Sequence, residues 1–446
     1  MKSSSKKWMA SLLVASMTLV AAGCGSSAST DSGSETDGGQ KASEPIKFMH
    51  MYDKNSDQGP SHQSELIEKF KKDHPEIKLT EEIQSHDAYE TKIKTLAAGN
   101  ELPDVFLMKS SMVKTFVDNG LVLPLDDMLN GDADWKNGFV SGALDTYTVD
   151  NKVYGIQFSG GPTHTIFYNK DLLAKAGYSE FPKSWDDFIK LIDALKAKGI
   201  TPIAFGNKGK WLANSSYLST LGDRFTGTAW FNSLKDYGGA KFTDPEFVQA
   251  LTALQDLNKH GAFNSDMNSI DNNQMKTLYY NEKAAMFIEG AWAISAMEAG
   301  APKEIVDKTE LAVFPAISGA KGEQNSVSGG GGWAYAVNAN VDKSKLKDIA
   351  LLLKSLSDKN AAEVILKYGD MPSSKIEDMS KIELTPLMQK LIKLLETTKY
   401  VPIYDSQLSP ALTEEMNTAM QNMIIGQITP QQAAEQMQKE YEAEKQ

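Results

Sequence analysis

The amino-acid sequence predicts an α/β protein built from two lobes. Strand-like and helix-like segments alternate from residue 46 to residue 108, and this order predicts a parallel sheet with helices on its faces. The same alternation resumes after residue 150. The body that carries it spans about 400 residues, from 45 to 446. Because that length exceeds what one hydrophobic core usually serves, we expect two lobes.

The chain opens with the pattern of a secretory signal. Three lysines are followed by an uncharged, apolar run over residues 8–22, and the small residues Ala21, Ala22 and Gly23 stand directly before a cysteine. A basic start, a short apolar stretch and small residues before a cleavage point are typical of a signal peptide. The apolar run is too short to cross a bilayer comfortably. We therefore expect residues 1–23 to be removed.

Cys24 follows directly and is the only cysteine of the 446 residues. An internal disulfide is therefore impossible, and the position predicts a lipid-modified N-terminal cysteine. Ordinary cleavage with an idle cysteine is the alternative, and Ala21 favours it, because lipoprotein signals more often carry Leu there. Ser and Gly make up half of residues 25–44, so we expect 24–44 to form a lipid-bearing, flexible tether.

The first part of the body contains three expected strands and two expected helices. A helical stripe through Leu66 and Phe70 ends before Pro75, because the residue before a proline is pushed out of the helical region. A second helix over 88–98 ends at Gly99. The strands are expected at 46–52, around Ile77 and Leu79, and at 102–108.

The second part repeats the alternation. Strands are expected at 152–158, 166–168 and 201–205. The helix between them begins at Ser184, whose hydroxyl is expected to cap it while the acid three residues later reaches back. Gly199 is expected to end that helix.

Charge argues against a nucleic-acid partner. The chain has 46 basic and 58 acidic residues, and removal of the three signal lysines leaves an even more acidic protein. Phosphate backbones attract basic surfaces, and no cluster of Lys and Arg stands out.

Four segments resemble family 1 extracellular solute-binding proteins of ABC sugar importers. They are GNELPDVFLMKSSMVKTFVDNGLVLPLDDML (99–129), VYGIQFSGGPTHTIFYNKDLLAKAGYSEFPKSWDDFIKL (153–191), NEKAAMFIEGAWAISAM (281–297) and SGGGGWAYAVNAN (328–340). Together with the lipoprotein-like signal, they cover nearly the whole chain in the order expected for that family.

The resemblance implies a two-lobe, type II periplasmic-binding-protein-like fold with an interdomain cleft and hinge crossings. The N-terminal lobe would contain 45–155 and 331–371, and the C-terminal lobe 156–330 and 372–446. The implied function is to bind a sugar, a di- or oligosaccharide, and to deliver it to ABC permease subunits. We expect a monomer without cofactor, held by Cys24 on the extracellular face of the membrane, as in a Gram-positive cell, or on the periplasmic side where an outer membrane exists.

Sugar recognition needs flat aromatic faces, and clefts supply them from loops at the carboxyl ends of strands. Trp292 is the leading candidate, because it follows an apolar strand and Gly290 and matches the stacking tryptophan of the family. Trp211 follows a strand and a glycine-bearing loop, and Trp333 follows four glycines. For all three the alternative is an ordinary place in the core.

Polar partners of the sugar are expected near strand ends, although each single polar residue there is more often only solvated. The candidates are Asp53, Lys109, Ser110, Ser159, Glu289, Tyr404 and Asp405.

Other classes of site fit less well. The acids of 53–57 are spaced as in a calcium loop, but Gln58 and Ser64 stand where that loop needs Gly and a bidentate acid. Tyr279 and Tyr280 resemble a pair of iron ligands, without the other ligands of an iron site. We expect no metal and no catalytic residues. Two alternatives stay open: a phosphorylated polyol as ligand, for which the basic candidates are Lys109, Lys208 and Lys210, and a lipid-anchored glycosidase, which needs two carboxylates about 5 to 10 Å apart.

Overall fold

The computed structural model describes residues 44–53 and 61–445. The expected signal, the lipidated Cys24 and nearly all of the tether lie outside the described residues. In the two described ranges, none of the helices combines the length and the apolar character that crossing a bilayer requires.

The first sheet has five strands in the order β2-β1-β3-β13-β6. As predicted, β1 runs parallel to both β2 and β3, whereas β13 is antiparallel to β3 and to β6. The sheet is therefore parallel on one side and antiparallel on the other. Its strands are β1 (Ile46–His50), β2 (Leu79–Ile83), β3 (Val105–Lys109), β6 (Ile156–Gln157) and β13 (Trp333–Val337).

The second strand begins later than the sequence predicts. Ile77 lies in a turn closed by its own N–H, which donates to the carbonyl of His74 at 3.1 Å. Its side chain is nevertheless buried, so the apolar alternation at Ile77 and Leu79 reflects burial and not a strand at both positions. β2 continues to Ile83 through residues that are partly exposed.

A second sheet has four strands in the order β11-β8-β10-β9. β10 pairs in parallel with β9, and β8 is antiparallel to both of its neighbours. The second part of the chain is thus also α/β, but with a mixed sheet. The strands are β8 (Thr165–Asn169), β9 (Thr201–Ala204), β10 (Ala284–Glu289) and β11 (Thr309–Ala312).

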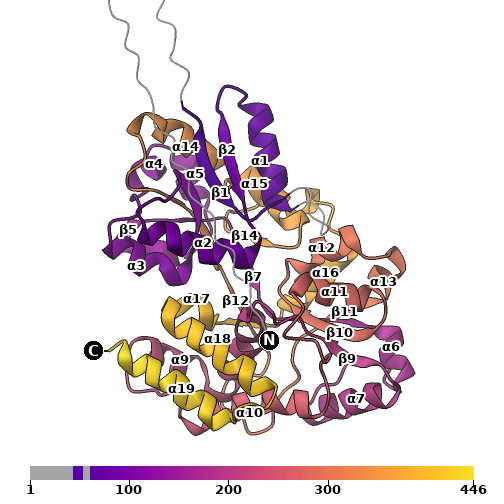
Figure 1. The fold of residues 1–446 in the computed structure, drawn as a ribbon. Helices are drawn as coiled ribbons and strands as arrows, with labels where there is room; N and C mark the ends of the chain where they lie inside the picture. The colour runs from indigo at the N-terminus through magenta and orange to yellow at the C-terminus, as the bar shows by residue number, and fades with distance from the viewer. Residues whose placement is uncertain (1–43, 54–60, 446) are drawn as a thin grey trace, which may run out of the picture. The chain divides into compact units, whose positions relative to one another are not determined.

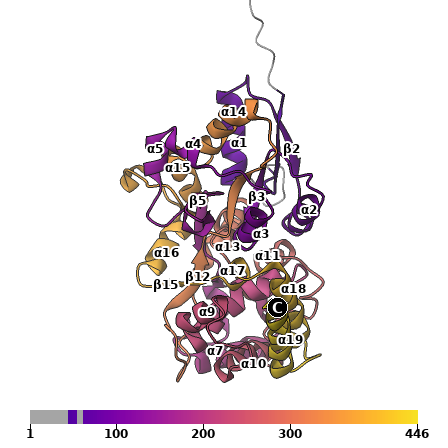
Figure 2. The ribbon, with the colours of Figure 1, turned by 90° about the vertical axis from the view of Figure 1, so that its left-hand side faces the viewer.

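A third sheet, in the order β14-β7-β12-β15, joins segments far apart in the sequence. Figures 1 and 2 show β12 between the two groups of elements described below. A side chain on Gly160 would meet the carbonyl oxygen of Gly330 at 2.9 Å, and Gly330 itself has a φ of 136°, so this close crossing requires glycine at both positions. The strands are β7 (Ser159–Pro162), β12 (Ser326–Gly330), β14 (Met371–Pro372) and β15 (Lys399–Val401).

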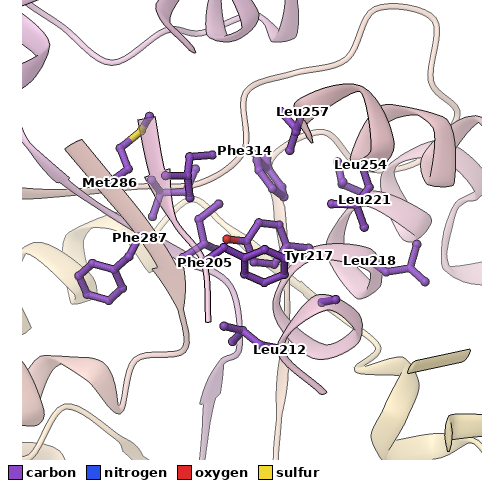
Figure 3. Close-up of a cluster of buried hydrophobic side chains, with 14 of the residues drawn as sticks. Phe205, Leu212, Tyr217, Leu218, Leu221, Leu254, Leu257, Met286, Phe287 and Phe314 are labelled. Atoms are coloured by element: carbon purple, nitrogen blue, oxygen red, sulfur yellow. The ribbon is translucent and has the colours of Figure 1, made fainter. Parts of the chain in front are cut away.

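The buried apolar side chains form two separate clusters. Core 1 collects residues between Ile46 and Phe158 and between Ala334 and Ile365. Core 2 collects residues between Ile166 and Ile317 and between Leu366 and Tyr441. Figure 3 shows the centre of core 2, where Phe205, Tyr217 and Phe314 pack together. In Figure 1 the core 1 elements therefore combine indigo and orange segments, and the core 2 elements run from magenta through orange to yellow.

Helices place their apolar faces on these cores. Those that enter core 1 are α1 (His62–Asp73), α2 (His86–Ala98), α3 (Val113–Asp118), α4 (Asp126–Asn130), α5 (Ala133–Gly138), α14 (Leu346–Ser355) and α15 (Lys359–Lys367). Those that enter core 2 are α6 (Lys170–Lys175), α7 (Trp185–Ala197), α8 (Ser219–Thr226), α9 (Thr228–Lys235), α10 (Pro245–Lys259), α11 (Asn272–Tyr280), α12 (Ala293–Gly300), α13 (Lys303–Lys308), α16 (Pro386–Leu395), α17 (Tyr404–Gln407), α18 (Pro410–Ile424) and α19 (Pro430–Ala443).

The cap expected at Ser184 is present. The Ser184 hydroxyl accepts a hydrogen bond from the backbone N–H of Asp187, three residues into α7. The Asp187 carboxylate, however, accepts from the Ser184 hydroxyl at 2.8 Å and not from the backbone N–H of the cap, so the reciprocal half of the predicted box is missing. The helix ends as expected, with Gly199 at a φ of 73°.

Candidate functional site

Five ring side chains follow one another in space: Trp292, Trp211, His86, Trp333 and Tyr89. We call them the aromatic row. Successive ring centroids are 6.2, 5.1, 5.9 and 5.7 Å apart. Trp211 packs against core 2 and Trp333 against core 1, so the row runs from one core to the other. Its three tryptophans are only half-buried, which leaves ring surface that a flat apolar ligand face can cover.

Trp292 sits in the sharp turn that links β10 to α12. Its indole N–H donates to the carboxylate of Glu289 at 3.0 Å. A Cβ atom at Gly290 would overlap the six-membered part of the same indole. The ring is thus folded back over the glycine, and the sequence Glu–Gly–x–Trp determines this local arrangement.

The carboxyl ends of the parallel strands of the first sheet meet at one edge, where ligands of α/β proteins commonly bind. There β2 ends and α2 begins at His86, which places His86 and Asp87 beside the loop that carries Trp211. A Cβ atom at Gly209 in that loop would lie 2.6 Å from the Asp87 carboxylate. His86 and Tyr89 were not predicted from the sequence. The beginning of a helix directly behind a parallel strand was the signal that could have found them.

Lys109, the last residue of β3, is buried beside two carboxylates. Its ammonium lies 3.0 Å from Asp405 and 3.4 Å from Glu90. Burial by itself would lower the pKa of Lys109, but the two carboxylates outweigh that effect and raise it. Burial would likewise raise the pKa of Glu90, and Lys109 and Lys94 instead lower it to about 2. Lys109 and Glu90 are therefore both arranged to be charged.

The neighbouring serine makes a second contact between the same two segments. The hydroxyl of Ser110 donates to the backbone carbonyl of Ser406 at 2.5 Å. Lys109 and Asp405 are thus bonded to each other, Ser110 is bonded to the backbone of Ser406, and all three of these candidates for contacts with ligand are buried. In this structure they connect β3 to α17, and the second carboxylate oxygen of Asp405 is buried without a hydrogen-bond partner among the described residues.

Three other polar candidates have different surroundings. Glu289 is fully buried, with one carboxylate oxygen accepting from Asn272 and Trp292. Ser159 is half-buried in β7, where it pairs with Pro372. Asp53 is exposed at the end of the first described range.

Tyr404, another candidate, is buried in this structure. Its side chain is fully buried in core 2, where its ring stacks on Phe231 with centroids 4.2 Å apart and planes 1° from parallel. The sequence suggested it as a polar partner of the sugar because it follows the turn at Val401 and Pro402, whereas α17 turns its ring into core 2.

A second cluster lies where α1 begins. The imidazole Nδ1 of His62 is 3.4 Å from the carboxylate of Asp370, and the rings of Tyr52, Phe158 and Tyr368 surround the histidine at 6.1 to 6.4 Å. Burial lowers the pKa of His62 to about 3 and raises the pKa of Asp370 to about 7. Neither His62 nor Asp370 was predicted, because their pairing joins segments 308 positions apart in sequence.

Comparisons with known proteins give one consistent result. The multiple sugar-binding protein of Streptococcus mutans is 28% identical over 264 residues, which is 57% of this chain and 58% of that protein. The chain thus matches less than two thirds of that curated relative's length. A solved structure from work on xylan utilization by Caldanaerobius polysaccharolyticus has 28% identity and a TM-score of 0.79, covering 89% of this chain and 99% of the other.

A chitin oligosaccharide binding protein has 24% identity and a TM-score of 0.80, with 90% and 99% of the two chains covered. These neighbours confirm the predicted two-lobe, type II α/β fold. The family model described as bacterial extracellular solute-binding protein matches residues 55–358, more than half of the sequence. The resemblance seen in the four sequence segments is thereby confirmed, and this chain belongs to the family of bacterial extracellular solute-binding proteins.

Proposed function

We propose that the chain binds a neutral sugar, a di- or oligosaccharide, and delivers it to the permease of an ABC importer. The aromatic row carries the proposal. Half-buried tryptophans offer flat faces to the C–H side of pyranose rings, and a row of them can contact more than one sugar unit. The multiple sugar-binding protein and the chitin oligosaccharide binding protein support a sugar as the ligand class by their names.

The ion pairing of the candidate lysines favours a neutral ligand over a phosphorylated polyol. Of the three basic candidates, Lys109 is buried between two carboxylates, and Lys210 is paired with Glu414 at 2.9 Å. Lys208 is exposed, and of these three lysines only Lys208 belongs to no ion pair between described residues. A phosphate group would need cations that are not already neutralised.

Binding without catalysis is also part of the proposal. A glycosidase needs two carboxyl groups that face the sugar. Near the aromatic row, Glu289 and Asp405 are buried and each is paired with a lysine. Incubating the protein with the sugars described below should return them uncleaved, and release of shorter products would contradict this part of the proposal.

The division into lobes is likewise proposed, as 45–155 with 331–371 and 156–330 with 372–446. The segregation of apolar residues into core 1 and core 2 supports it. Ile156 and Phe158 pack in core 1, so we move the first boundary from residue 155 to just after Phe158. The ligand would lie between the lobes, along the aromatic row.

The location follows from the N-terminal segment. We propose that Cys24 bears a lipid that holds a monomeric protein at the extracellular face of the membrane, as in a Gram-positive envelope. Replacing Cys24 with Ser should release the protein into the medium. A Cys24→Ser protein that stays with the membrane fraction would contradict the anchor and leave the ligand proposal untouched.

A thermal-shift screen tests the ligand. The panel should contain neutral xylo-, chito-, malto- and galacto-oligosaccharides of two to four units, with a phosphorylated polyol as the competing class. A ligand that binds only the folded protein stabilises it by about 2.7 kcal/mol at a hundredfold excess over the dissociation constant. A shift with the phosphorylated compound and with no neutral sugar would overturn the proposal.

A further inference from the structure

We propose that Glu289 is a positioning residue, which orients Trp292 as a platform for the sugar and does not itself contact the ligand. Lys276 and Asn272 hold the Glu289 carboxylate in place for this role. The inference rests on the proposed function and assigns the part that one buried network plays in it.

Glu289 contacts three protein side chains, although its second carboxylate oxygen takes part only in an ion pair and makes no hydrogen bond with the described residues. One carboxylate oxygen accepts from the indole N–H of Trp292 at 3.0 Å and from the side-chain amide of Asn272 at 2.6 Å. The other oxygen lies 3.4 Å from the ammonium of Lys276. The side chains of Glu289 and Lys276 are 0% and 3% exposed, so a sugar lying on the aromatic row cannot reach the carboxylate in this arrangement.

The charges of this pair compensate each other. An isolated carboxylate at such depth would be costly, and the ammonium of Lys276 on α11 offsets that cost. α11 is itself fixed at its first turn, where Asp271 and Gln274 form a reciprocal capping box. A carboxylate accepts hydrogen bonds more strongly than a neutral oxygen does, and an indole has a single N–H to donate. The charge therefore strengthens the one polar bond that Trp292 can make.

Two contacts at opposite ends of the indole fix the plane of the ring. Glu289 holds the N–H on the five-membered ring, and the backbone of Gly290 lies directly beneath the six-membered ring. A ring held in this way loses little conformational freedom when the sugar arrives, and preorganisation of this kind raises affinity. Glu289 thus acts on the ligand through Trp292.

A double-mutant cycle tests the inference on the full-length protein by titration calorimetry, with the oligosaccharide that gives the largest shift in the screen. Trp292→Phe keeps an aromatic ring but removes the N–H. Glu289→Gln should weaken binding about three- to tenfold in the wild type, because it replaces a charged acceptor with a neutral one. The same change should have no further effect in the Trp292→Phe background, since the bond it weakens is already gone.

Two outcomes would overturn the inference while the proposed function stands. If Glu289→Gln lowers the affinity equally in the wild-type and the Trp292→Phe backgrounds, Glu289 touches the sugar directly. If Glu289→Gln leaves the affinity unchanged in the wild-type background, the role of Glu289 is only structural. If the wild type binds no neutral sugar, the proposed function and the inference both fall.

Matched variants separate positioning from loss of stability. Lys345→Met removes a comparably buried ammonium that lies 2.9 Å from Asp104, in contact with core 1 elements and not with Trp292. It should lower the melting temperature and leave the affinity of the folded protein unchanged. If Glu289→Gln does not fold, Asn272→Ala replaces it in the cycle, because Asn272 is half-buried and donates to the same carboxylate oxygen. Asn272→Ala should lower the affinity less than Glu289→Gln would, and this loss should likewise be absent in the Trp292→Phe background.

Discussion

The ammonium nitrogen of Lys109 lies 3.0 Å from a carboxylate oxygen of Asp405, although 296 positions separate these residues in the sequence. Lys109 is the last residue of β3 in the first sheet. Asp405 lies in the short helix α17 next to Tyr404, whose side chain is buried in core 2. The ion pair therefore connects the two cores of the protein. With the adjacent bond from Ser110 to Ser406, it makes a polar junction that the aromatic row runs beside.

Breaking this junction on one side should be costly. Lys109→Met leaves Asp405 buried without its cation, and removing one partner of a buried pair typically destabilises a protein by about 3 to 5 kcal/mol. The double change Lys109→Met with Asp405→Leu should recover part of that loss, because no unpaired charge remains at Asp405. Denaturant unfolding of the three proteins measures both effects.

The control is an exposed pair of the same chemistry. Lys303 contacts Asp307 from one turn away on α13, with side chains 85% and 58% exposed, and exposed pairs contribute little to stability. Lys303→Met should leave the unfolding midpoint almost unchanged. Equal effects of Lys109→Met and Lys303→Met would show that the buried junction does not stabilise the fold.

Trp292 and Trp135 should respond in opposite ways to truncation. Trp292 is half-buried in the aromatic row, and Trp292→Ala should weaken sugar binding by about 2 kcal/mol, roughly thirtyfold, with little loss of apo stability. Trp135 is buried in core 1, with its N–H bonded to Ser357, and its truncation should cost about 3 to 5 kcal/mol of folding free energy. Calorimetric melting and titration of both variants decide the matter. If Trp292→Ala loses most of its stability while its folded fraction binds normally, Trp292 is a core residue.

A methyl group at Gly290 should act through the indole ring. The added carbon would overlap the ring of Trp292, whereas the φ of Gly290 is not among the positive values found at other glycines. We therefore expect Gly290→Ala to displace the ring and weaken sugar binding. Gly138→Ala is the control, because a Cβ atom there meets nothing within 4 Å. The prediction fails if the two alanine variants bind the sugar equally well.

The His62–Asp370 pair should make folding stability depend little on pH between about pH 4 and 6.5, because the effects of its two members oppose each other. Burial raises the pKa of Asp370 from 3.8 to about 7, so this group stabilises the fold at low pH, and its contribution is lost as the pH rises to 7. Burial lowers the pKa of His62 from 6.5 to about 3, so its contribution is present above pH 6.5 and is lost as the pH falls. Between about pH 4 and 6.5 the two slopes oppose each other, because the proton that the unfolded chain holds on His62 is held on Asp370 after folding.

Removing one member of the pair should reveal the pH dependence of the unfolding free energy that the other member causes. His62→Leu should make stability fall as the pH rises from 4 to 7, and Asp370→Asn should make it fall as the pH drops below 6.5. Each slope should approach about 1.4 kcal/mol per pH unit, the value for one proton. Nearby Tyr52 and Tyr400 do not interfere, because burial, as the largest cause, raises the pKa of both hydroxyls. Denaturant midpoints at pH 4.5, 5.5 and 6.5 measure the slopes, and parallel curves for both variants would contradict the pairing.

Much of the fold is set by local sequence. The alternation around Phe48, the proline behind α1, the cap at Ser184 and the glycine behind α7 each act within a few residues, so they predict elements without knowledge of the rest of the chain. Trp292 was found in the same way, because a buried strand followed by a glycine and a tryptophan is a local pattern. The methionines of α18 share one helical face, and their burial in core 2 follows from that spacing.

Only the tertiary structure decided which polar groups face each other. Lys109, Glu289 and Asp405 stand at strand ends or turns, where the sequence suggests contact with a ligand, but the fold buries them in ion pairs. His62 and Asp370 gave no local signal, since each has its partner in a distant segment. Periodicity and propensity act over a few residues, whereas the energy of a buried charge depends on whichever group lies within a few ångströms after folding. That partner is set by how the sheets pack together, and no short stretch of sequence contains it.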